Sequence, residues 1–299
     1  MRILALIPHF WRHDNREYGS NAANPFPRAL ALRNLIMALH GHFGRNQAII
    51  TSETSIEPVA EDPQSVVIPC IFTHGPHHLL EHLHLPDWAF RQIPCGGEPM
   101  HLGFRAHEFL KHQVGRFDWY CFMEDDLVIE DALFFQKLIW WQQILGPEHV
   151  LLPNRYELAM IEPKPNKLYV DARVGRAPRF WPDRQNGTFE GQVMGMKVRF
   201  ERVINPHSGC FFINDAQLRM LIESPGFLDY DMSFVGPLES AASLAIMKRF
   251  RVYKAMEPHM HFFEIRHHAT RFVNRLSIKL CGVLRNVLSR PALLTLSAT

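Results

Sequence analysis

Short apolar runs alternate with longer segments of helical spacing along the first half of the chain. The short β-prone runs are residues 2–7, 47–51, 65–72 and 118–123, and helical spacing is found around residues 28–40, 98–114 and 131–145. Strands that alternate with helices are typical of a mostly parallel sheet with helices packed on its faces. The pattern of hydrophobic and polar positions therefore predicts an α/β fold.

The pattern changes between residues 151 and 207, where six prolines and few clean periods predict loops and short strands. It resumes with an apolar run at residues 208–215, helical segments at 215–222 and 237–248, and a β-prone run at 250–256. We therefore expect one globular domain over residues 1–268.

The remaining residues, 269–299, form a basic tail. Its apolar residues recur every four positions, and basic residues lie beside them: Phe272, Leu276, Leu280, Leu284 and Leu288, with Arg271, Arg275 and Lys279. This spacing predicts a basic amphipathic helix over residues 269–290. Such a helix can lie on the anionic inner face of a membrane, or it can pack on the domain and leave its arginines exposed. The pattern does not distinguish the two.

Composition narrows the class of protein. With 299 residues, 47% of them hydrophobic, the chain can bury a large core. Its formal charge is only +2, and we expect no nucleic-acid partner. The five cysteines are scattered without a CxxC pair, which fits buried thiols in a reducing compartment. The apolar run before Pro8 is too short for a signal peptide. We therefore expect a cytoplasmic protein.

Three carboxylates, Glu124, Asp125 and Asp126, directly follow the apolar run at residues 118–123. In an open α/β sheet, ligands bind beyond the carboxyl ends of the strands, where these residues are expected. If the alternation of the strand persists, Glu124 and Asp126 face one side and Asp125 the other. A divalent cation such as Mg²⁺ or Mn²⁺, bound together with phosphate oxygens, would relieve their mutual repulsion.

An acidic turn without a metal explains the same residues. In that interpretation Asp125 or Asp126 accepts hydrogen bonds from loop amides, and Glu130 or Asp131 caps the next helix. The position after a buried strand favours the metal-diphosphate site. The sequence contains no glycine-rich phosphate-binding loop, so a metal and basic side chains would have to meet the charge of a diphosphate.

The order of first strand, polar loop, helix, and strand ending in Glu124-Asp125-Asp126 resembles the GT-A glycosyltransferases. In that family an Asp-x-Asp motif holds the metal bound to a nucleotide-sugar diphosphate. The resemblance implies a GT-A-like (Rossmann-like) mixed, mostly parallel sheet flanked by helices. It assigns the direct metal contact to Asp126, with Glu124 at the first position of the motif, and places Asp125 near the ribose or the donor sugar.

The loop after the first strand is where the resemblance places the nucleotide base and ribose. Arg16, Tyr18 and Asn21 offer stacking and hydrogen-bonding groups for the donor in this loop. A polar loop that binds no ligand has the same composition.

The segment 233–254 resembles the acceptor side of the same family, and Glu239 matches its acidic residue. Pro237 suits a first helical turn, and the helix dipole favours an ionised carboxylate at Glu239. Glu239 could then accept the proton of an acceptor hydroxyl as a general base. The alternative is a glutamate that only stabilises the helix start. Ser240 departs from the family, in which an Asp often follows the acid.

GT-A enzymes often complete the metal or diphosphate site with a histidine near the C-terminus. Of the histidines in "EPHMHFFEIRHH", we prefer His261 to His259 as a third metal ligand. His267 and His268 are expected to be solvated.

These features together indicate a glycosyltransferase that uses Mn²⁺ or Mg²⁺ to move a sugar from a nucleotide-sugar donor to a glycan or lipid-linked glycan acceptor. Residues 1–150 would bind the donor and residues 151–268 the acceptor. The expected setting is surface-polysaccharide or glycoconjugate assembly in the cytoplasm, with peripheral contact between the tail and the inner membrane face. Two other classes would use the same features: a metal-dependent nucleotidyltransferase or phosphohydrolase, and a non-catalytic membrane-associated glycan-binding protein.

Overall fold

The computed structural model describes residues 1–13, 23–52, 55–60, 64–158, 166–171, 187–202, 205–268 and 272–273. These residues form a mixed α/β structure with one five-stranded sheet, two four-stranded sheets, a two-stranded hairpin and five α-helices. The α/β fold expected from the hydrophobic pattern is confirmed.

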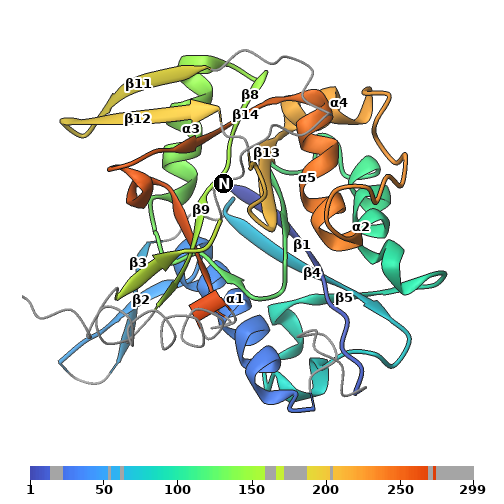
Figure 1. The fold of residues 1–299 in the computed structure, drawn as a ribbon. Helices are drawn as coiled ribbons and strands as arrows, with labels where there is room; N and C mark the ends of the chain where they lie inside the picture. Colours follow the sequence, from blue (N-terminus) through green and yellow to red (C-terminus); the bar gives the residue numbers. More distant parts are fainter. Residues whose placement is uncertain are drawn as a thin grey trace, which may run out of the picture.

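The five-stranded sheet lies at the centre of the fold (Figure 1). Its strand order is β13 (Cys210–Asn214), β6 (Trp119–Met123), β1 (Arg2–Pro8), β4 (Val66–His74) and β5 (Arg91–Cys95). Strands β6, β1, β4 and β5 are parallel, and β13 runs antiparallel beside β6. Strands β1 and β6 are buried along almost their whole length, because helices cover both faces of the sheet.

Two sets of helices cover the two faces of this sheet. Ile3, Ala5 and Ile7 of β1 lie in one core with residues of α1 (Phe26–Phe43) and α3 (Phe134–Leu145). Leu4 and Leu6 lie in a second core, with residues of α2 (Leu102–Lys111), α4 (Asp215–Ile222) and α5 (Pro237–Arg249). The alternation of side chains along β1 therefore divides the interior into two cores.

Two smaller sheets extend the domain beyond the central one. The first has the order β10 (Lys167–Tyr169), β9 (Asn154–Leu158), β15 (Glu264–His267) and β7 (Leu127–Val128). The second has the order β11 (Thr188–Val193), β12 (Met196–Arg202), β14 (Arg251–Ala255) and β8 (His149–Leu151). The proline-rich part of the sequence thus contributes short strands, as its pattern predicts.

The remaining elements are a hairpin and short 3₁₀ helices. Strands β2 (Gln47–Ile50) and β3 (Ile56–Ala60) pair only with each other, so the β-prone run at 47–51 does not join the central sheet. The 3₁₀ helices are η2 (Leu80–His82), η3 (Asp87–Ala89), η4 (Pro99–His101) and η5 (Met260–Phe262).

The acidic triplet forms the turn between β6, in the central sheet, and β7, in the first small sheet. The Glu124 N–H donates to the carbonyl of Gly209, next to β13, over 2.9 Å. Gly209 has φ +64°, and a Cβ atom there would lie 2.7 Å from Oε2 of Glu124. Glycine is favoured at this position, because its backbone is left-handed and a larger residue would displace the glutamate side chain that passes against it.

The tail predicted as a helix over residues 269–290 lies almost wholly outside the described residues. Phe272 and Val273 are described, and their backbone is helical. In the described part of the chain, no helix is both long enough and apolar enough to cross a membrane.

Gly103 provides a test of how closely α2 and α5 pack. A Cβ atom on Gly103 would lie 2.6 Å from Cβ of Ala241 in α5, whereas one on Gly41 in α1 would meet nothing within 4 Å. We expect Gly103→Ala to lower the free energy of unfolding by about 1–3 kcal/mol through overpacking. Gly41→Ala, the matched control, should raise it by up to about 1 kcal/mol, because alanine favours a helix. Urea denaturation measures both changes, and equal effects would contradict the close helix contact.

Candidate functional site

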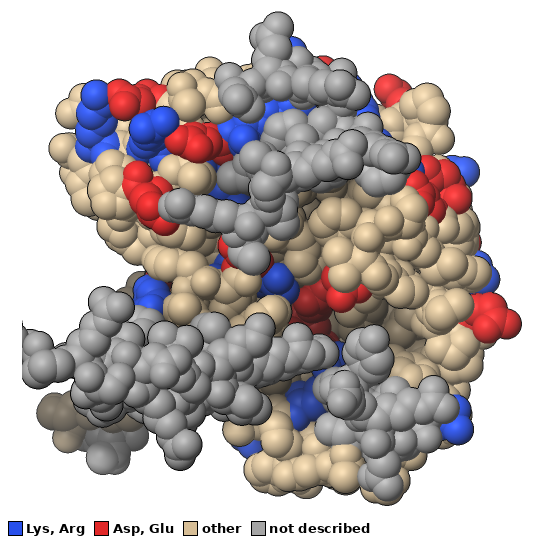
Figure 2. All heavy atoms as spheres, viewed as in Figure 1, with Lys and Arg blue, Asp and Glu red and all other residues tan. Residues whose placement is uncertain are grey.

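The candidate site lies at the carboxyl ends of the central parallel strands β1 and β6. His9 directly follows β1, and the triplet directly follows β6. Figure 2 shows acidic and basic side chains meeting in a recess near the middle of one face of the molecule. This is the edge at which open α/β sheets bind ligands.

Asp125 points into the protein and is only 1% exposed. Its carboxylate contacts Nδ1 of His9 at 2.5 Å, and it pairs with Arg28 through Nε at 3.0 Å and Nη2 at 2.6 Å. Nε2 of His9 accepts the Leu79 N–H at 3.0 Å, so Nδ1 carries the proton that His9 donates to Asp125. The expected contact of Asp125 with a ribose or sugar does not fit a carboxylate that is turned inwards and already paired.

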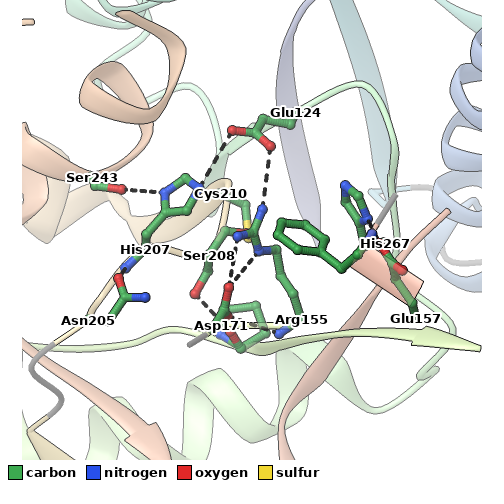
Figure 3. Close-up of polar contacts among 12 residues, drawn as sticks. Glu124, Arg155, Glu157, Asp171, Asn205, His207, Ser208, Cys210, Ser243 and His267 are labelled. Atoms are coloured by element: carbon green, nitrogen blue, oxygen red, sulfur yellow. Dashed lines mark hydrogen bonds and ion pairs between the residues drawn. The ribbon is translucent and has the colours of Figure 1, made fainter. Parts of the chain in front are cut away.

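Glu124 faces the opposite way and is held only loosely. Its oxygens lie 3.7 Å from Nη1 of Arg155 and 4.0 Å from Nε2 of His207, both beyond hydrogen-bonding distance (Figure 3). Burial raises the pKa of Glu124 to about 7; the positive charge of Arg155 opposes this rise, and the negative charges of Asp126 and Glu239 add to it. Glu124, Asp126 and Glu239 are therefore close enough to repel one another.

Asp126 and a second carboxylate, Glu157, both contact the buried ring of His267. Nε2 of His267 lies 3.3 Å from Oδ2 of Asp126, and Nδ1 of His267 lies 2.8 Å from Glu157. Burial alone would lower the pKa of His267, but the charge and hydrogen bond of Asp126 and the hydrogen bond of Glu157 raise it to about 10. Burial would raise the pKa of Asp126, but His267, and then Arg28 and Arg155, hold it below its usual range.

The expectation that both histidines are solvated is therefore wrong for His267, whereas His268 is half-buried. His267 is buried between Asp126 and Glu157. The His268 ring contacts the Asn34 amide at 2.8 Å, and its backbone N–H donates to the Asp126 carbonyl at 2.7 Å. Strand β15 brings both residues to the triplet, because His267 pairs with Leu127 of β7.

A buried ionic network supports Glu124 from the side of β9 and β14. Arg155 pairs with Asp171 through Nε and Nη2, each at 2.8 Å, and Lys254 contacts the same carboxylate at 2.7 Å. Lys254 also donates to the His207 carbonyl at 2.8 Å, and Nδ1 of His207 contacts the Ser243 hydroxyl at 2.9 Å. These contacts fix Arg155 and His207 in position beside Glu124 (Figure 3).

The protonation states in this network follow from burial and pairing. Burial, and then the charge of Arg155, hold the pKa of His207 well below its usual value, so its ring is neutral. Burial would raise the pKa of Asp171, but Arg155 and Lys254 bring it below its usual range. The positive charges of Arg155 and Lys254 are thus balanced mainly by the Asp171 carboxylate. The negative charge of Glu124 is balanced only in part.

Glu239 lies in the first turn of α5, as the sequence predicts. Its Oε2 atom lies 2.6 Å from where a Cβ on Gly236 would be, so the side chain folds back over the helix start. No side-chain hydrogen bond caps this helix. Glu239 lies where its charge can stabilise the helix start, and that charge also raises the pKa of Glu124.

The described part of the site fits a divalent cation held by two carboxylates. Oδ1 of Asp126 is buried without a hydrogen-bond partner, and Glu124 makes no direct hydrogen bond to its cationic neighbours. Six carboxylates face four cationic groups in the linked cluster: Glu124, Asp125, Asp126, Glu157, Asp171 and Glu239 against Arg28, Arg155, Lys254 and His267. Two negative charges remain uncompensated when all six acids are ionised.

The structure does not support the third metal ligand expected from the sequence. His261 lies in η5 and is exposed. Across the described ranges, no three His, Cys, Asp or Glu side chains come together in a way that could hold a metal ion. Arg16, Tyr18 and Asn21, the expected donor-binding residues, lie outside the described residues.

Sequence reasoning missed the basic half of the site. Arg28, Arg155 and Lys254 were not singled out, because their carboxylate partners lie 97, 16 and 83 positions away in the chain. One signal was present: Arg155 and Glu157 are charged residues two positions apart in β9, shortly after the apolar run Val150-Leu151-Leu152, and both are buried. Charged residues inside a buried strand are seldom neutral to function or stability.

Comparisons with known proteins give little further information. No model of a known protein family matches the chain, and no curated protein matches it. Among solved structures, the chain is similar to a crystal structure of a mannose-1-phosphate geranyltransferase from Thermus thermophilus. The two are 13% identical, the match covers 85% of this chain and 73% of that chain, and the TM-score is 0.37. At these values the likeness carries no argument about this protein.

The raised pKa of His267 predicts a loss of stability in alkaline solution. A folded-state pKa of about 10, against 6.5 for the free side chain, means that the stabilisation from His267 is complete below pH 6.5 and is lost as the pH rises towards 10. In His267→Gln, the free energy of unfolding should therefore fall less steeply across this pH range than in the wild type. Urea denaturation at a series of pH values measures the two slopes.

His261→Gln, at an exposed histidine of η5, is the matched control and should keep the wild-type slope. Equal slopes in the wild type and in His267→Gln would contradict a cationic His267 between Asp126 and Glu157.

Proposed function

We propose that this protein is a glycosyltransferase of the GT-A type that transfers a sugar from a nucleotide-sugar donor with the help of Mn²⁺ or Mg²⁺. The observation that carries the proposal is that Glu124 and Asp126, directly after β6 at the carboxyl edge of the parallel strands, keep side-chain oxygens that make no hydrogen bond to their neighbours, with Glu239 acting on Glu124 through its charge. Two carboxylates suited to a metal and one suited to a base are the groups that this chemistry needs.

Glu124 and Asp126 are the proposed metal ligands. Mg²⁺ and Mn²⁺ bind characteristically through one or two carboxylates and complete their coordination with substrate phosphates and water. A bound cation would neutralise the diphosphate that leaves with the nucleotide. Two protein carboxylates therefore suffice, and a third protein ligand such as His261 is not needed.

Arg28 and Arg155 are the proposed partners of the donor phosphates. Both guanidinium groups lie beside the triplet, since Arg28 pairs with Asp125 at 2.6 Å and Nη1 of Arg155 lies 3.7 Å from Glu124. Each is fixed by a buried carboxylate, Arg28 by Asp125 and Arg155 by Asp171. A guanidinium held by a carboxylate on one edge presents its remaining N–H groups in a fixed direction, which suits phosphate recognition.

Glu239 is the proposed general base. It would accept the proton of an acceptor hydroxyl while that oxygen attacks the anomeric carbon and the bond to the diphosphate breaks. A base in this position implies inversion at the anomeric carbon. The acceptor side would be formed by residues 151–268, with a glycan or lipid-linked glycan as acceptor, in surface-polysaccharide or glycoconjugate assembly.

Donor binding tests the metal ligands. With a panel of nucleotide-sugars and titration calorimetry, we expect at least one donor to bind more tightly with Mn²⁺ than without it. Asp126→Ala and Glu124→Gln should abolish the Mn²⁺ effect, with losses no smaller than the roughly 10–100-fold caused by removing outer-shell partners in metal sites. Asp118→Asn, at a half-exposed carboxylate that pairs with Arg2, is the control and should bind like the wild type. Donor binding that ignores both Mn²⁺ and Asp126→Ala would remove the proposed site.

Transfer by Glu239→Gln tests the base. The variant should keep the affinity for the donor and lose transfer by about 10²–10⁴-fold, because only proton abstraction is removed. Glu81→Gln, at an exposed glutamate, is the matched control. A fully active Glu239→Gln would reject the base, and products that contain a transferred nucleotide, or phosphate released without an acceptor, would indicate the nucleotidyltransferase or phosphohydrolase instead.

A further inference from the structure

The ring of His207 lies between α5 and Glu124. Its Nδ1 atom contacts the Ser243 hydroxyl at 2.9 Å, and its Nε2 atom points towards Oε1 of Glu124, 4.0 Å away (Figure 3). The second distance is too long for a hydrogen bond, so within the described part of the chain one ring nitrogen is engaged and the other faces Glu124 across a gap. The His207 side chain keeps 11% of its surface exposed. Nε2 is therefore the hydrogen-bonding atom that this ring can offer to a ligand.

Three contacts hold the His207 ring in one orientation. Ser243 engages Nδ1, and Lys254 donates to the His207 carbonyl at 2.8 Å. The ring of Phe234, from the segment before α5, packs on the His207 ring with 5.9 Å between the two centroids. A side chain that is fixed before a ligand arrives loses little conformational entropy on binding, so its hydrogen bond contributes more to affinity.

Helix α5 brings the His207 ring close to the proposed base. Ser243 and Glu239 are four residues apart in α5, so they lie one turn apart on the same side of the helix. His207 contacts Ser243, and Glu239 is close enough to raise the pKa of Glu124, which Nε2 of His207 faces. Glu124, Glu239 and Nε2 of His207 therefore border the same part of the site.

A hydroxyl group is the ligand chemistry that suits this nitrogen. Burial, and then the charge of Arg155, lower the pKa of His207, so the ring is neutral and suits an uncharged group better than a phosphate. An oxygen about 2.8 Å from both Nε2 and Oε1 of Glu124 would bridge the 4.0 Å gap, with an angle of about 90° at that oxygen. A hydroxyl can do this, because it accepts one hydrogen bond and donates another.

We propose that Nε2 of His207 binds a sugar hydroxyl between Glu124 and Glu239, and so determines which sugar the protein accepts. The inference rests on the proposed function and adds the group of the substrate that is recognised. The hydroxyl belongs either to the donor sugar or to the acceptor, because the two must meet between the metal ligands and the base.

Two substitutions of His207 separate ligand recognition from a structural role. In His207→Asn the amide can replace Nδ1 and keep the Ser243 contact, whereas in His207→Gln the amide can reach the position of Nε2. We expect His207→Asn to weaken binding of the recognised sugar by roughly threefold to tenfold, the effect of one neutral hydrogen bond, and His207→Gln to weaken it less. A ring that only holds Ser243 predicts the opposite order. His112→Asn, at an exposed histidine after α2, is the control and should match the wild type.

Analogues that lack single hydroxyl groups provide the second measurement. Titration calorimetry with Mn²⁺ compares the tightest-binding nucleotide-sugar of the panel with its monodeoxy analogues, and initial rates give KM for methyl hexosides and their monodeoxy analogues as acceptors. One analogue should bind roughly threefold to tenfold more weakly than its parent in the wild type and no more weakly than its parent in His207→Asn, because both changes remove the same hydrogen bond. A donor analogue with this behaviour assigns the hydroxyl to the donor sugar, and an acceptor analogue assigns it to the acceptor.

The outcomes separate this inference from the proposed function. If Asp126→Ala abolishes the Mn²⁺ effect but the losses in His207→Asn add to those of every analogue, the role of His207 is overturned and the metal site stands. A larger loss in His207→Gln than in His207→Asn overturns the same role. The wild type alone also tests it, because equal binding of every analogue and its parent would leave no hydroxyl for His207 to recognise. A wild type that binds no nucleotide-sugar would overturn both the inference and the proposed function.

Discussion

The buried pairing of Asp125 with His9 and Arg28 is the interaction on which the rest of the site depends. It joins the end of β1, the first turn of α1 and the turn after β6 through a single carboxylate. Removing one partner from such a buried group leaves an unpaired charge, which typically costs about 3–5 kcal/mol. The pairing holds the middle carboxylate of the triplet in the interior, while Glu124 and Asp126 contact other groups, Arg155 and His207 in one case and His267 in the other.

In this arrangement some carboxylates are paired with arginines inside the protein, whereas others keep oxygens that a ligand could contact. Asp125 and Asp171 each pair with an arginine through two contacts inside the protein. Glu124 and Asp126 keep oxygens that are not hydrogen-bonded, and Glu239 adds a third negative charge close to them. An excess of negative charge next to fixed guanidinium groups can attract both a cation and the phosphates that accompany it.

The sequence was sufficient for those parts of the fold that depend on local pattern. Continuous apolar runs marked β1 and β6 as buried parallel strands. The alternation of β6 does not continue through the triplet, which forms a turn, although Asp125 is turned inwards and away from the groups that contact Glu124 and Asp126. The partners of the triplet could not be predicted, because Arg28 reaches Asp125 across 97 positions and His9 across 116. His267 was misjudged for the same reason: a polar segment near the end of the sequence looks solvated unless its pairing with β7 is known.

Glu157 connects the candidate site to the start of the C-terminal segment. One of its oxygens contacts His267, the neighbour of Asp126, and the two oxygens together receive the N–H groups of Phe272 and Val273. A single carboxylate is therefore shared between the ligand-facing edge of the sheet and the start of the C-terminal segment. Any ligand that draws Asp126 away from His267 changes the charge that Glu157 must balance, and so changes how firmly that segment is anchored. Thermodynamic reciprocity requires the converse with the same coupling free energy: a partner that pulls the C-terminal segment away alters the affinity at Asp126.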